Sequence, residues 1–307
     1  MIDGVFIHGP YTERGDLAAA LAEGSQGARR GHQLALASIT HTESAIDATA
    51  RSLEHAITEL GSSRVETSDV VSKLREQWLQ IINDLTAKKQ EAWAALEAAE
   101  SALDEFSITL FGRTMAGKST LMEILIRGRG DSIGRGGQRT TRDVRDYHWR
   151  GIKVTDVPGI GDSEGTEDQE RALAAARQAD LVLFVITDDA PQPIEAECLA
   201  RVRSFGKPIV GILNVKRGFQ DQDDIADFLR APEKVIDRDR LRDLVDQFHA
   251  FADSHHPGNR IAFVYTHLHA RFLAGRTGDP QQCRALRKAS QFVRVEERIL
   301  DQIRRRA

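Results

Sequence analysis

The chain has 307 residues, of which 41% are hydrophobic and 29% are charged, as is ordinary for a folded protein. Its 42 lysines and arginines against 46 aspartates and glutamates give a net charge of −4, which excludes a globally basic nucleic-acid binder but not a local basic patch. Two cysteines are too few for a disulfide scaffold or a four-ligand zinc site, so a reduced, cytoplasmic setting is expected. We see neither a basic, apolar leader nor a run of about 20 apolar residues, so we expect no signal peptide and no transmembrane segment, and any membrane contact to be peripheral.

The first third of the chain is predicted to form a helical hairpin. Residues 15–105 contain no proline and are rich in helix-forming residues, and Gly61-Ser62-Ser63 divides them into two arms. These helices either pack on the following domain or form a coiled-coil-like stalk for self-association. The prediction depends on apolar residues that recur every three or four positions, which gives each arm one apolar face: Ile46, Ala50, Leu53, Ile57 and Leu60, then Val71, Leu74, Trp78, Ile81 and Leu85, and finally Ala92, Leu96, Ala99, Leu103 and Phe106.

Between residues 106 and 275, short apolar runs alternate with segments of helical periodicity. Strands that alternate with helices form a mostly parallel sheet covered by helices on both faces. We therefore predict an α/β domain over 106–275, preceded by the helical hairpin over 1–105 and followed by a C-terminal helix within 276–307. The expected strands cover 108–111, 152–157, 181–187, 208–213 and 261–266.

A phosphate-binding loop follows the first predicted strand. The segment from Gly112 to Thr120 matches G-x-x-x-x-G-K-[ST] between a strand and a helix. Its glycines let backbone N–H groups converge on a phosphate, and the helix N-terminus adds positive potential. Lys118 is expected to reach the β- and γ-phosphates, and the Ser119 hydroxyl to ligate Mg²⁺. The whole loop is predicted to bind the nucleotide, through Gly112, Arg113, Thr114, Met115, Ala116, Gly117, Lys118, Ser119 and Thr120.

Two further segments fit the same site. Asp156-Val-Pro-Gly159 follows an apolar run, where a carboxylate can hold Mg²⁺ and the Gly159 N–H can meet the γ-phosphate. Residues 127–143 contain five glycines, which suits a loop that γ-phosphate and Mg²⁺ would order. Thr140 or Thr141 in that loop could add a metal ligand.

The order of these motifs resembles the Era/TrmE-like branch of translation-factor-class P-loop GTPases, and dynamin-like GTPases share much of it. The resemblance covers residues 105–275. It implies a GTP-binding G domain that uses Mg²⁺, with conformational switching and an antiparallel edge strand at 143–149. It also assigns Mg²⁺ coordination to Thr141 beside Ser119 and Asp156, and it makes Lys118 and Thr141 the candidate catalytic residues.

The base-reading motif of that family, N-K-x-D, is matched only in part. Asn214 fits and is expected to touch the base, but Val215 and Arg217 occupy the Lys and Asp positions. The family's Asp accepts two hydrogen bonds from guanine, whereas an Arg side chain only donates. Selectivity for guanine over adenine is therefore left open. Lys216 could stack on the base after a register shift, or a nearby carboxylate could fold back, from Asp221, Asp223 or Asp224.

The sequence offers few residues that could assist GTP hydrolysis. Ile160 follows Gly159, and an apolar side chain cannot position a water molecule. Met115 is a poor K⁺ ligand where some relatives use Asn or Ser. An arginine from 127–143, Arg139 or Arg142, or one from a second subunit, would supply positive charge to the transition state. We predict slow hydrolysis that self-association or a partner raises.

These observations allow three functions for the protein. One is a dynamin-like GTPase that forms homodimers through its G domain or its helical arms and acts on a membrane. Another is an Era-like switch that associates with RNA or the ribosome. The last is a nucleotide-binding scaffold with relaxed base specificity and little hydrolysis. The basic C-terminal helix is either a solvated face or a contact for an anionic surface.

Two smaller predictions concern polar residues after strands. Asp188 and Asp189 follow the strand expected at 181–187, where carboxylates lie near the ligand side of such a sheet, but they also precede Pro191 and are expected to cap a helix. His267 and His269 are interpreted as surface or loop histidines, because no Cys, His and carboxylate set has a metal-ligand spacing.

Overall fold

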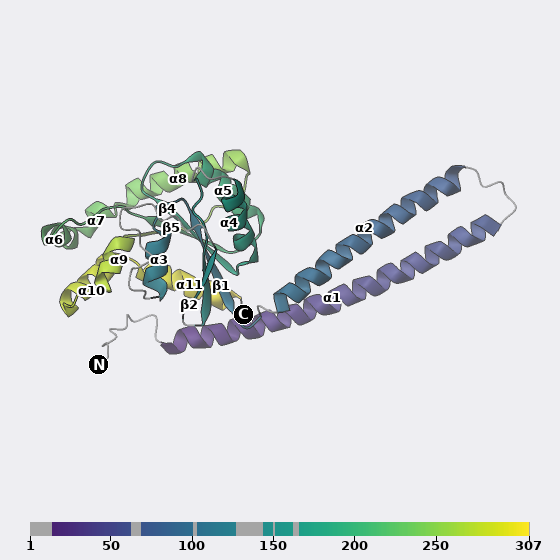
Figure 1. The fold of residues 1–307 in the computed structure, drawn as a ribbon, viewed down its shortest axis with the longest axis horizontal. Coiled ribbons are helices and arrows are strands. Elements are labelled where there is room, and N and C mark those ends of the chain that lie inside the picture. The colour runs from purple at the N-terminus through teal and green to yellow at the C-terminus, as the bar shows by residue number, and fades with distance from the viewer. Residues whose placement is uncertain are drawn as a thin grey trace. The chain divides into compact units, whose positions relative to one another are not determined.

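The computed structural model describes residues 14–62, 69–100, 103–126, 144–149, 151–161 and 166–306 (Figure 1). They form two compact units. The sheet unit covers Met1–Ala22 and Glu105–Arg305, as far as these ranges are described, and the arm unit covers Glu23–Asp104 with Arg306. The predictions for Arg139, Thr140, Thr141 and Arg142 lie outside the described residues. The expected domain boundaries at 105 and 275 stay predictions.

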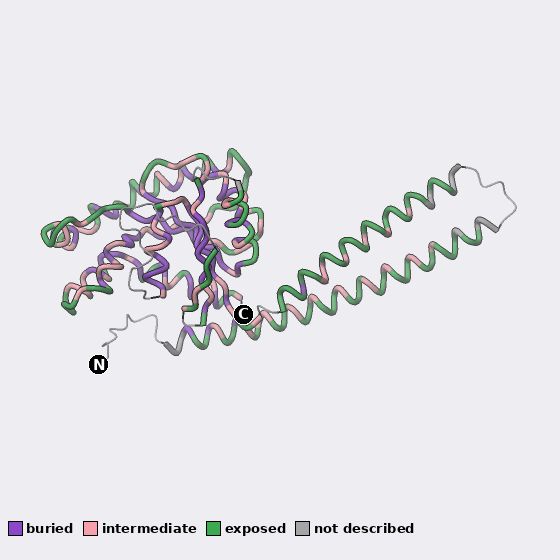
Figure 2. The backbone as a smooth tube through the Cα atoms, viewed as in Figure 1, coloured by how far each residue is buried: buried purple, intermediate pink, exposed green. Residues whose placement is uncertain are grey.

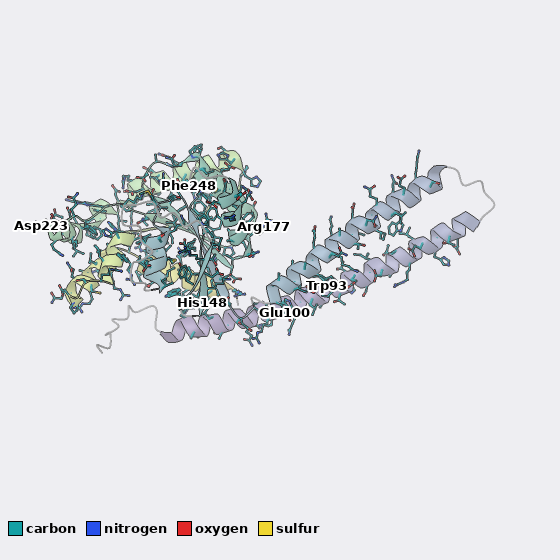
Figure 3. All side chains as sticks on the ribbon, in the orientation of Figure 1. Trp93, Glu100, His148, Arg177, Asp223 and Phe248 are labelled. Atoms are coloured by element: carbon teal, nitrogen blue, oxygen red, sulfur yellow. The ribbon has the colours of Figure 1, made fainter. Side chains whose placement is uncertain are left out.

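The arm unit consists mainly of two long helices, α1 (Arg14–Ser62) and α2 (Asp69–Glu100), and Figure 3 labels Trp93 and Glu100 on α2. Half-buried side chains recur along α1 every three or four residues and define an apolar seam with some polar members. On α2 the seam runs through Trp78, Ile82, Leu85, Lys89, Ala92 and Leu96. It includes Ile82 in place of the predicted Ile81, which is 48% exposed.

The two seams meet through polar as well as apolar side chains. Lys89 Nζ donates to Glu43 Oε1 over 2.7 Å, and this hydrogen-bonded contact raises the pKa of Lys89. Nearer residue 100, Arg29 Nη2 lies 2.6 Å from Asp104 Oδ1. Among the arm side chains that the structure describes, Leu96 is the buried large apolar one, and Figure 2 shows the arms mostly exposed or intermediate.

The sheet unit is built on six strands in the order β2-β3-β1-β4-β5-β6. Strand β2 runs antiparallel to β3 at one edge, and the remaining neighbours are parallel. This confirms the mostly parallel sheet and the antiparallel edge strand expected at 143–149. The strands are β1 (Phe106–Gly112), β2 (Arg145–Trp149), β3 (Ile152–Asp156), β4 (Leu181–Thr187), β5 (Ile209–Asn214) and β6 (Phe263–Thr266).

Helices cover both faces of the sheet, because the central strands are apolar on both sides. One core joins the sheet to α4 (Thr166–Gln178), α5 (Pro193–Ser204) and α8 (Arg238–His255). The other joins it to α3 (Lys118–Ile126), α11 (Val293–Arg305) and the first turns of α1, through Leu17 and Ala20. The remaining helices are α6 (Gln222–Arg230), α7 (Pro232–Val235), α9 (Leu268–Ala274) and α10 (Pro280–Ala289).

The C-terminal segment forms two helices, α10 and α11, where the sequence indicated one. Gln291 adopts a φ of +57° between them, which a continuous helix does not allow. The Ser290 carbonyl accepts hydrogen bonds from His267 N and Thr266 Oγ1. The break therefore ties this segment to the end of β6.

Two negative findings hold for the part of the chain that the structure describes. No helix there combines the length and apolar character needed to cross a membrane. No cluster of three or more His, Cys, Asp or Glu side chains is arranged to hold a metal ion there. The cysteines differ in environment: Cys198 on α5 is buried, which raises its pKa to about 12, whereas Cys283 on α10 is half-buried.

Candidate nucleotide-binding site

The loop between β1 and α3 is closed by hydrogen bonds of its own lysine. Lys118, the first residue of α3, is 7% exposed, and its Nζ donates to Gly112 O over 2.9 Å and to Arg113 O over 3.1 Å. Ala116 N donates to Arg113 O, and Leu121 N to Gly117 O. The loop therefore curls around the ammonium group, which is where a bound polyphosphate would find its counter-charge.

Two glycines of this loop are required by close packing. Gly112 has a φ of +149°, and a Cβ on it would lie 2.2 Å from the Val185 carbonyl oxygen of β4. Gly117 has a φ of +106°, and its Cβ would lie 2.6 Å from Asn214 Nδ2. Both positions exclude larger residues on backbone and steric grounds.

Met115, in the same loop, is a non-glycine residue with a strained backbone. Its φ is +62°, a region that side chains rarely adopt, and its side chain is 77% exposed. Backbone strain of this kind is found at ligand sites more than elsewhere.

The segment after β3 lies directly against the loop. Ile160 N donates to Gly112 O over 3.3 Å, and Thr114 N donates to Ile160 O over 3.3 Å. A Cβ on Gly159 would lie 2.1 Å from Thr114 Oγ1, so glycine is needed for this approach. The buried Asp156, at the end of β3, precedes this segment. The Ile160 side chain is buried in the core, so it does not face a ligand.

The predicted metal ligands are only partly described. Ser119 and Thr120 lie in the first turn of α3 and are half-buried, and Asp156 ends β3. Thr141 lies outside the described residues. The carboxylate and hydroxyl oxygens of Asp156 and Ser119 are ligand types that Mg²⁺ accepts, and their roles stay predictions.

On the predicted base side, Asn214 ties three segments together. Its Nδ2 donates to Ala116 O over 3.0 Å, and its Oδ1 accepts from Leu268 N over 3.2 Å. Val215 is buried in the core, so the position that holds Lys in the N-K-x-D pattern contributes no ligand contact here. Lys216 and Arg217 are exposed.

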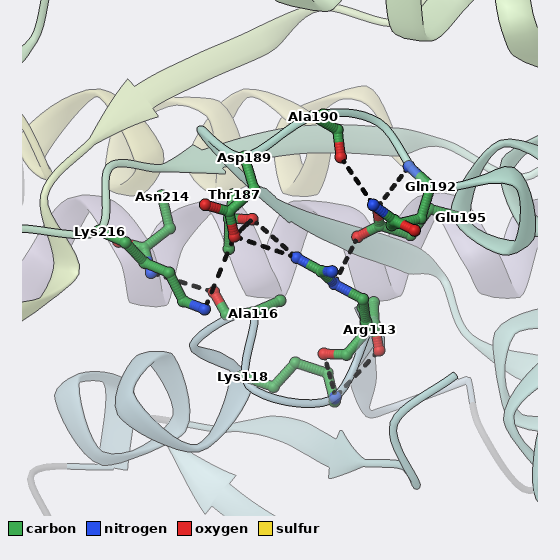
Figure 4. A network of polar contacts seen from close by, with 11 residues as sticks. Arg113, Ala116, Lys118, Thr187, Asp189, Ala190, Gln192, Glu195, Asn214 and Lys216 are labelled. Carbon is green, nitrogen blue, oxygen red and sulfur yellow. Dashed lines mark hydrogen bonds and ion pairs between the residues drawn. The ribbon is translucent and has the colours of Figure 1, made fainter. Parts of the chain in front are cut away.

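A network of charged groups joins Arg113 to the carboxyl ends of β4 and β5 (Figure 4). Arg113 Nη2 donates to Thr187 Oγ1 and to Asp189 Oδ2, each over 3.2 Å. Arg113 Nε lies 3.5 Å from Glu195 Oε1. Burial raises the pKa of Glu195, and Arg113 opposes that shift. Arg113 thus anchors the loop through its side chain as well as its backbone.

The capping role predicted for Asp188 and Asp189 is wrong. Gln192 caps α5, and it exchanges hydrogen bonds with Glu195 in a capping box. Asp188 accepts instead from Lys216 N over 2.7 Å, and Asp189 contacts Arg113. The sequence did carry a signal that these two carboxylates lie near the ligand. They follow a buried strand, and ligands of such sheets bind beyond the carboxyl ends of the strands.

His267 lies in the loop between β6 and α9, as the prediction of a surface or loop histidine allowed, but it is buried. It precedes α9, and its Nδ1 accepts from Ala270 N over 3.1 Å. Burial, together with a smaller effect of the nearby His269, lowers its pKa to about 4. The ring of Phe219 stacks on both imidazoles, with centroids 5.0 Å from His267 and 5.3 Å from the half-buried His269. The sequence signal for this capping role was a polar residue just before a helix.

Comparison with known proteins places this site in a family. Residues 107–215 match the family model described as 50S ribosome-binding GTPase. The chain is 36% identical over 141 residues to the tRNA modification GTPase MnmE of Bradyrhizobium sp. (strain BTAi1). The aligned region covers 44% of this chain and 32% of that protein. The chain is 34% identical over 133 residues to GTPase Der of Xanthomonas campestris pv. campestris (strain B100), covering 40% and 28%. Residues 107–215 therefore belong to a P-loop GTPase domain.

These similarities leave much of the chain unmatched. The chain spans about a third of the length of the curated relatives it matches. Among solved structures, Era in complex with MgGDPNP and 16S ribosomal RNA is similar at 17% identity and a TM-score of 0.39, over 64% of this chain and 56% of that one. The family of the domain therefore rests on the sequence matches.

Proposed function

We propose that this protein binds guanine nucleotides with Mg²⁺ and hydrolyses GTP. The observation that carries the proposal is the loop from Gly112 to Gly117, which closes around Lys118 and is held by Asn214. The match of residues 107–215 to a GTPase family supports the choice of nucleotide.

In this proposal each part of the site has one task. The backbone N–H groups of the loop and the Lys118 ammonium bind the β- and γ-phosphates. Ser119 and Asp156 hold Mg²⁺, and Thr141 adds a ligand in the triphosphate state. When bound, Mg²⁺ neutralises charge on the phosphate oxygens as it develops. Gly159 allows the segment after β3 to approach the γ-phosphate.

The proposed hydrolysis is slow in the isolated chain. The Ile160 side chain is buried and apolar, so it cannot orient the attacking water. The transition state then depends on positive charge from the 127–143 segment or from a second molecule. If a second copy supplies this charge, hydrolysis per molecule should rise with protein concentration. A fast rate that does not depend on protein concentration would contradict the proposed slow hydrolysis.

For the role that GTP hydrolysis serves, the half-exposed seams of α1 and α2 favour a dynamin-like function that works through self-association. In this form the arm unit serves as a stalk, and the protein contacts a membrane peripherally. Co-sedimentation with anionic liposomes, with GDP and with a non-hydrolysable GTP analogue, tests the membrane contact. Absence of binding in both states would count against it.

A ribosome- or RNA-associated switch is the second candidate. The description of the matching family model, 50S ribosome-binding GTPase, favours it. It predicts nucleotide-dependent co-sedimentation with ribosomal particles that weakens as salt is raised. A nucleotide-binding scaffold with little hydrolysis is the third, and it requires binding without turnover.

Nucleotide binding is the first test. GTP, GDP, ATP and ADP are titrated with Mg²⁺ into the wild type, Lys118→Ala and the control Lys234→Ala, which removes an exposed lysine of α7. Guanine nucleotides should bind at least about tenfold more tightly than adenine nucleotides, and only Lys118→Ala should abolish binding. Equal binding of ATP would support relaxed base specificity, and no binding by the wild type would overturn the proposal.

A further inference from the structure

Strand β2 forms one edge of the sheet, and among the described residues it pairs with β3 alone (Figure 1). The pairing is antiparallel and covers Arg145–Trp149. An edge strand presents main-chain N–H and C=O groups to which another strand can bond. Natural proteins often protect such an edge with charged side chains. The charges on β2 therefore decide whether a second copy of the strand is repelled or attracted.

The two faces of β2 carry different kinds of side chain. Tyr147 and Trp149 are half-buried and pack against the core that includes α3 and α11. The other face carries Asp146 and His148, whose side chains are 44% and 71% exposed (Figure 3). Successive residues of a strand point to opposite faces, so this division follows from the sequence. The polar pair is therefore accessible at the edge of the sheet.

Contacts with neighbouring residues hold this polar pair in position. Asp146 Oδ1 accepts from Thr155 Oγ1 over 2.6 Å, and Asp146 Oδ2 lies 2.8 Å from Lys153 Nζ. His148 Nε2 lies 3.0 Å from Glu105 Oε1, and none of the described residues bonds to its Nδ1. A carboxylate oxygen can accept a second hydrogen bond, and a protonated imidazole donates from both nitrogens. Asp146 and His148 can therefore each take one further partner.

An antiparallel pair of two β2 strands has one register in which these charges match. In that register Tyr147 lies opposite Tyr147 of the second copy, and Asp146 lies opposite His148 of the second copy, once on each side of a two-fold axis. A shift by two residues would set Asp146 opposite Asp146, or His148 opposite His148. A shift by one would bring side chains of different faces together. The charges of β2 therefore suit a second copy of the same strand in a single register.

We propose that β2 is a self-association surface, at which two copies of the chain pair antiparallel and continue one sheet into the other. The contact supplies about four to six main-chain hydrogen bonds and two pairs of Asp146 with His148 between the copies. Lys153 and Asp146 of one copy then form a row of alternating charge with His148 and Glu105 of the other. The inference goes beyond the proposed function, because the pairing requires neither a bound nucleotide nor the arm unit.

Two charge variants and their mixture test the pairing. Sedimentation velocity is measured over a concentration series of the full chain, at about pH 6, below the usual pKa of histidine. Asp146→Lys sets a lysine opposite His148, and His148→Asp sets an aspartate opposite Asp146, at both ends of the contact. Each variant alone should associate at least about tenfold more weakly than the wild type.

The equimolar mixture of the two variants is the decisive sample. In a mixed dimer each substituted residue meets a residue of opposite charge, so association should recover to within about threefold of the wild type. A defect in folding would persist in the mixture and cannot produce this recovery. Asp246→Lys is the matched control, because it makes the same charge change at the Arg260–Asp246 ion pair of α8 and should leave association unchanged.

Three outcomes would overturn the pairing. A wild type that stays monomeric over the whole series would mean that the charges of β2 protect the edge. Association that is unchanged in both variants would place the contact elsewhere, for example on the arms. Association that is weakened in both variants but does not recover in the mixture would show that these two residues do not meet each other across the contact. The proposed function is tested separately, by GTP binding to the wild type.

Discussion

The sheet unit and the arm unit bury their apolar residues in different ways. In the sheet unit, β4 is buried along its whole length, and two cores fill the space on either face. In the arm unit, Leu34 is 71% exposed and Leu79 is 55% exposed, and the seam side chains are at most half-buried, apart from Leu96. Burial of apolar surface thus accounts for the fold of the sheet unit, whereas helix propensity and a few polar contacts carry more of the arms.

This difference has a consequence for where ligand chemistry can be placed. A site needs groups held within a fraction of an ångström, and closely packed strands provide that precision. Every described contact of the nucleotide site comes from the sheet unit. The arms offer a long, half-exposed surface, which suits association rather than catalysis.

The largest expected effect is the loss of a buried aromatic ring. Phe184 of β4 is fully buried and stacks on Phe111 with a centroid distance of 5.5 Å. Phe184→Ala should lower the free energy of unfolding by about 3–5 kcal/mol, measured by urea denaturation. Leu79→Ala in the arms is the control and should change it by less than about 0.5 kcal/mol. Similar losses in both variants would erase the contrast between the units.

Gly112→Ala tests the close contact between the phosphate-binding loop and β4. The new Cβ would lie 2.2 Å from Val185 O, at a φ of +149° that alanine does not favour. We expect a loss of about 3 kcal/mol in unfolding free energy, together with the loss of GTP binding. Gly206→Ala, at a positive φ but with open space around it, should cost about 1 kcal/mol and spare binding. An unaffected Gly112→Ala protein would show that the contact is relaxed in solution.

Buried His267 predicts how the stability of the sheet unit depends on pH. Its pKa falls from about 6.5 in the unfolded chain to about 4 in the folded one, so the unfolded state binds more protons between these values. The neutral His267 therefore supports the free energy of unfolding fully above about pH 6.5. As the pH falls from 6.5 toward 4, this free energy should decrease by about 2–3 kcal/mol. Chemical denaturation at several pH values measures this slope.

His267→Asn is the variant for that experiment. An asparagine can still accept from Ala270 N at the start of α9, so the cap is kept while the titration is removed. The variant should show a shallower loss of stability between pH 6.5 and pH 4. An unchanged slope would mean that His249 and His269, whose pKa values burial also lowers, account for the dependence.

The smallest effect is expected in the arms. Gly31 lies within α1, and a Cβ placed on it meets nothing within 4 Å. Gly31→Ala should therefore stabilise the helix by about 0.5–1 kcal/mol, seen as a higher helix content or melting temperature by circular dichroism. A destabilised Gly31→Ala protein would indicate that this part of α1 is covered by another molecule.

The sequence predicted the elements whose residues carry a local signal. The alternation of apolar runs and helical segments indicated a mostly parallel sheet, and the G-x-x-x-x-G-K-[ST] pattern located the loop before α3. A strand that is buried on both faces reads as a continuous apolar run, as β4 does. These signals depend only on residues that are close together in the sequence, so they can be recognised before the fold is known.

Contacts between distant segments could not be predicted in the same way. Asp188 and Lys216 are 28 residues apart, and their hydrogen bond arises because β4 and β5 are neighbours in the sheet. On α2, a choice between Ile81 and Ile82 for the seam depends on the position of α1, and the 3–4 spacing alone favoured the wrong one. The burial of His267 likewise depends on Phe219, a residue of the β5–α6 connection.

The contrast between the two cysteines gives the protein a built-in place for a fluorescent label. At neutral pH the Cys198 thiol stays protonated and is shielded inside α5, so a maleimide dye should react with Cys283 and leave Cys198 untouched. Cys283 lies on α10, which packs against α9, and α9 begins at Leu268, whose N–H is bonded to Asn214. A dye at this one thiol would sit two helices from the base side of the site, and it requires no engineered cysteine.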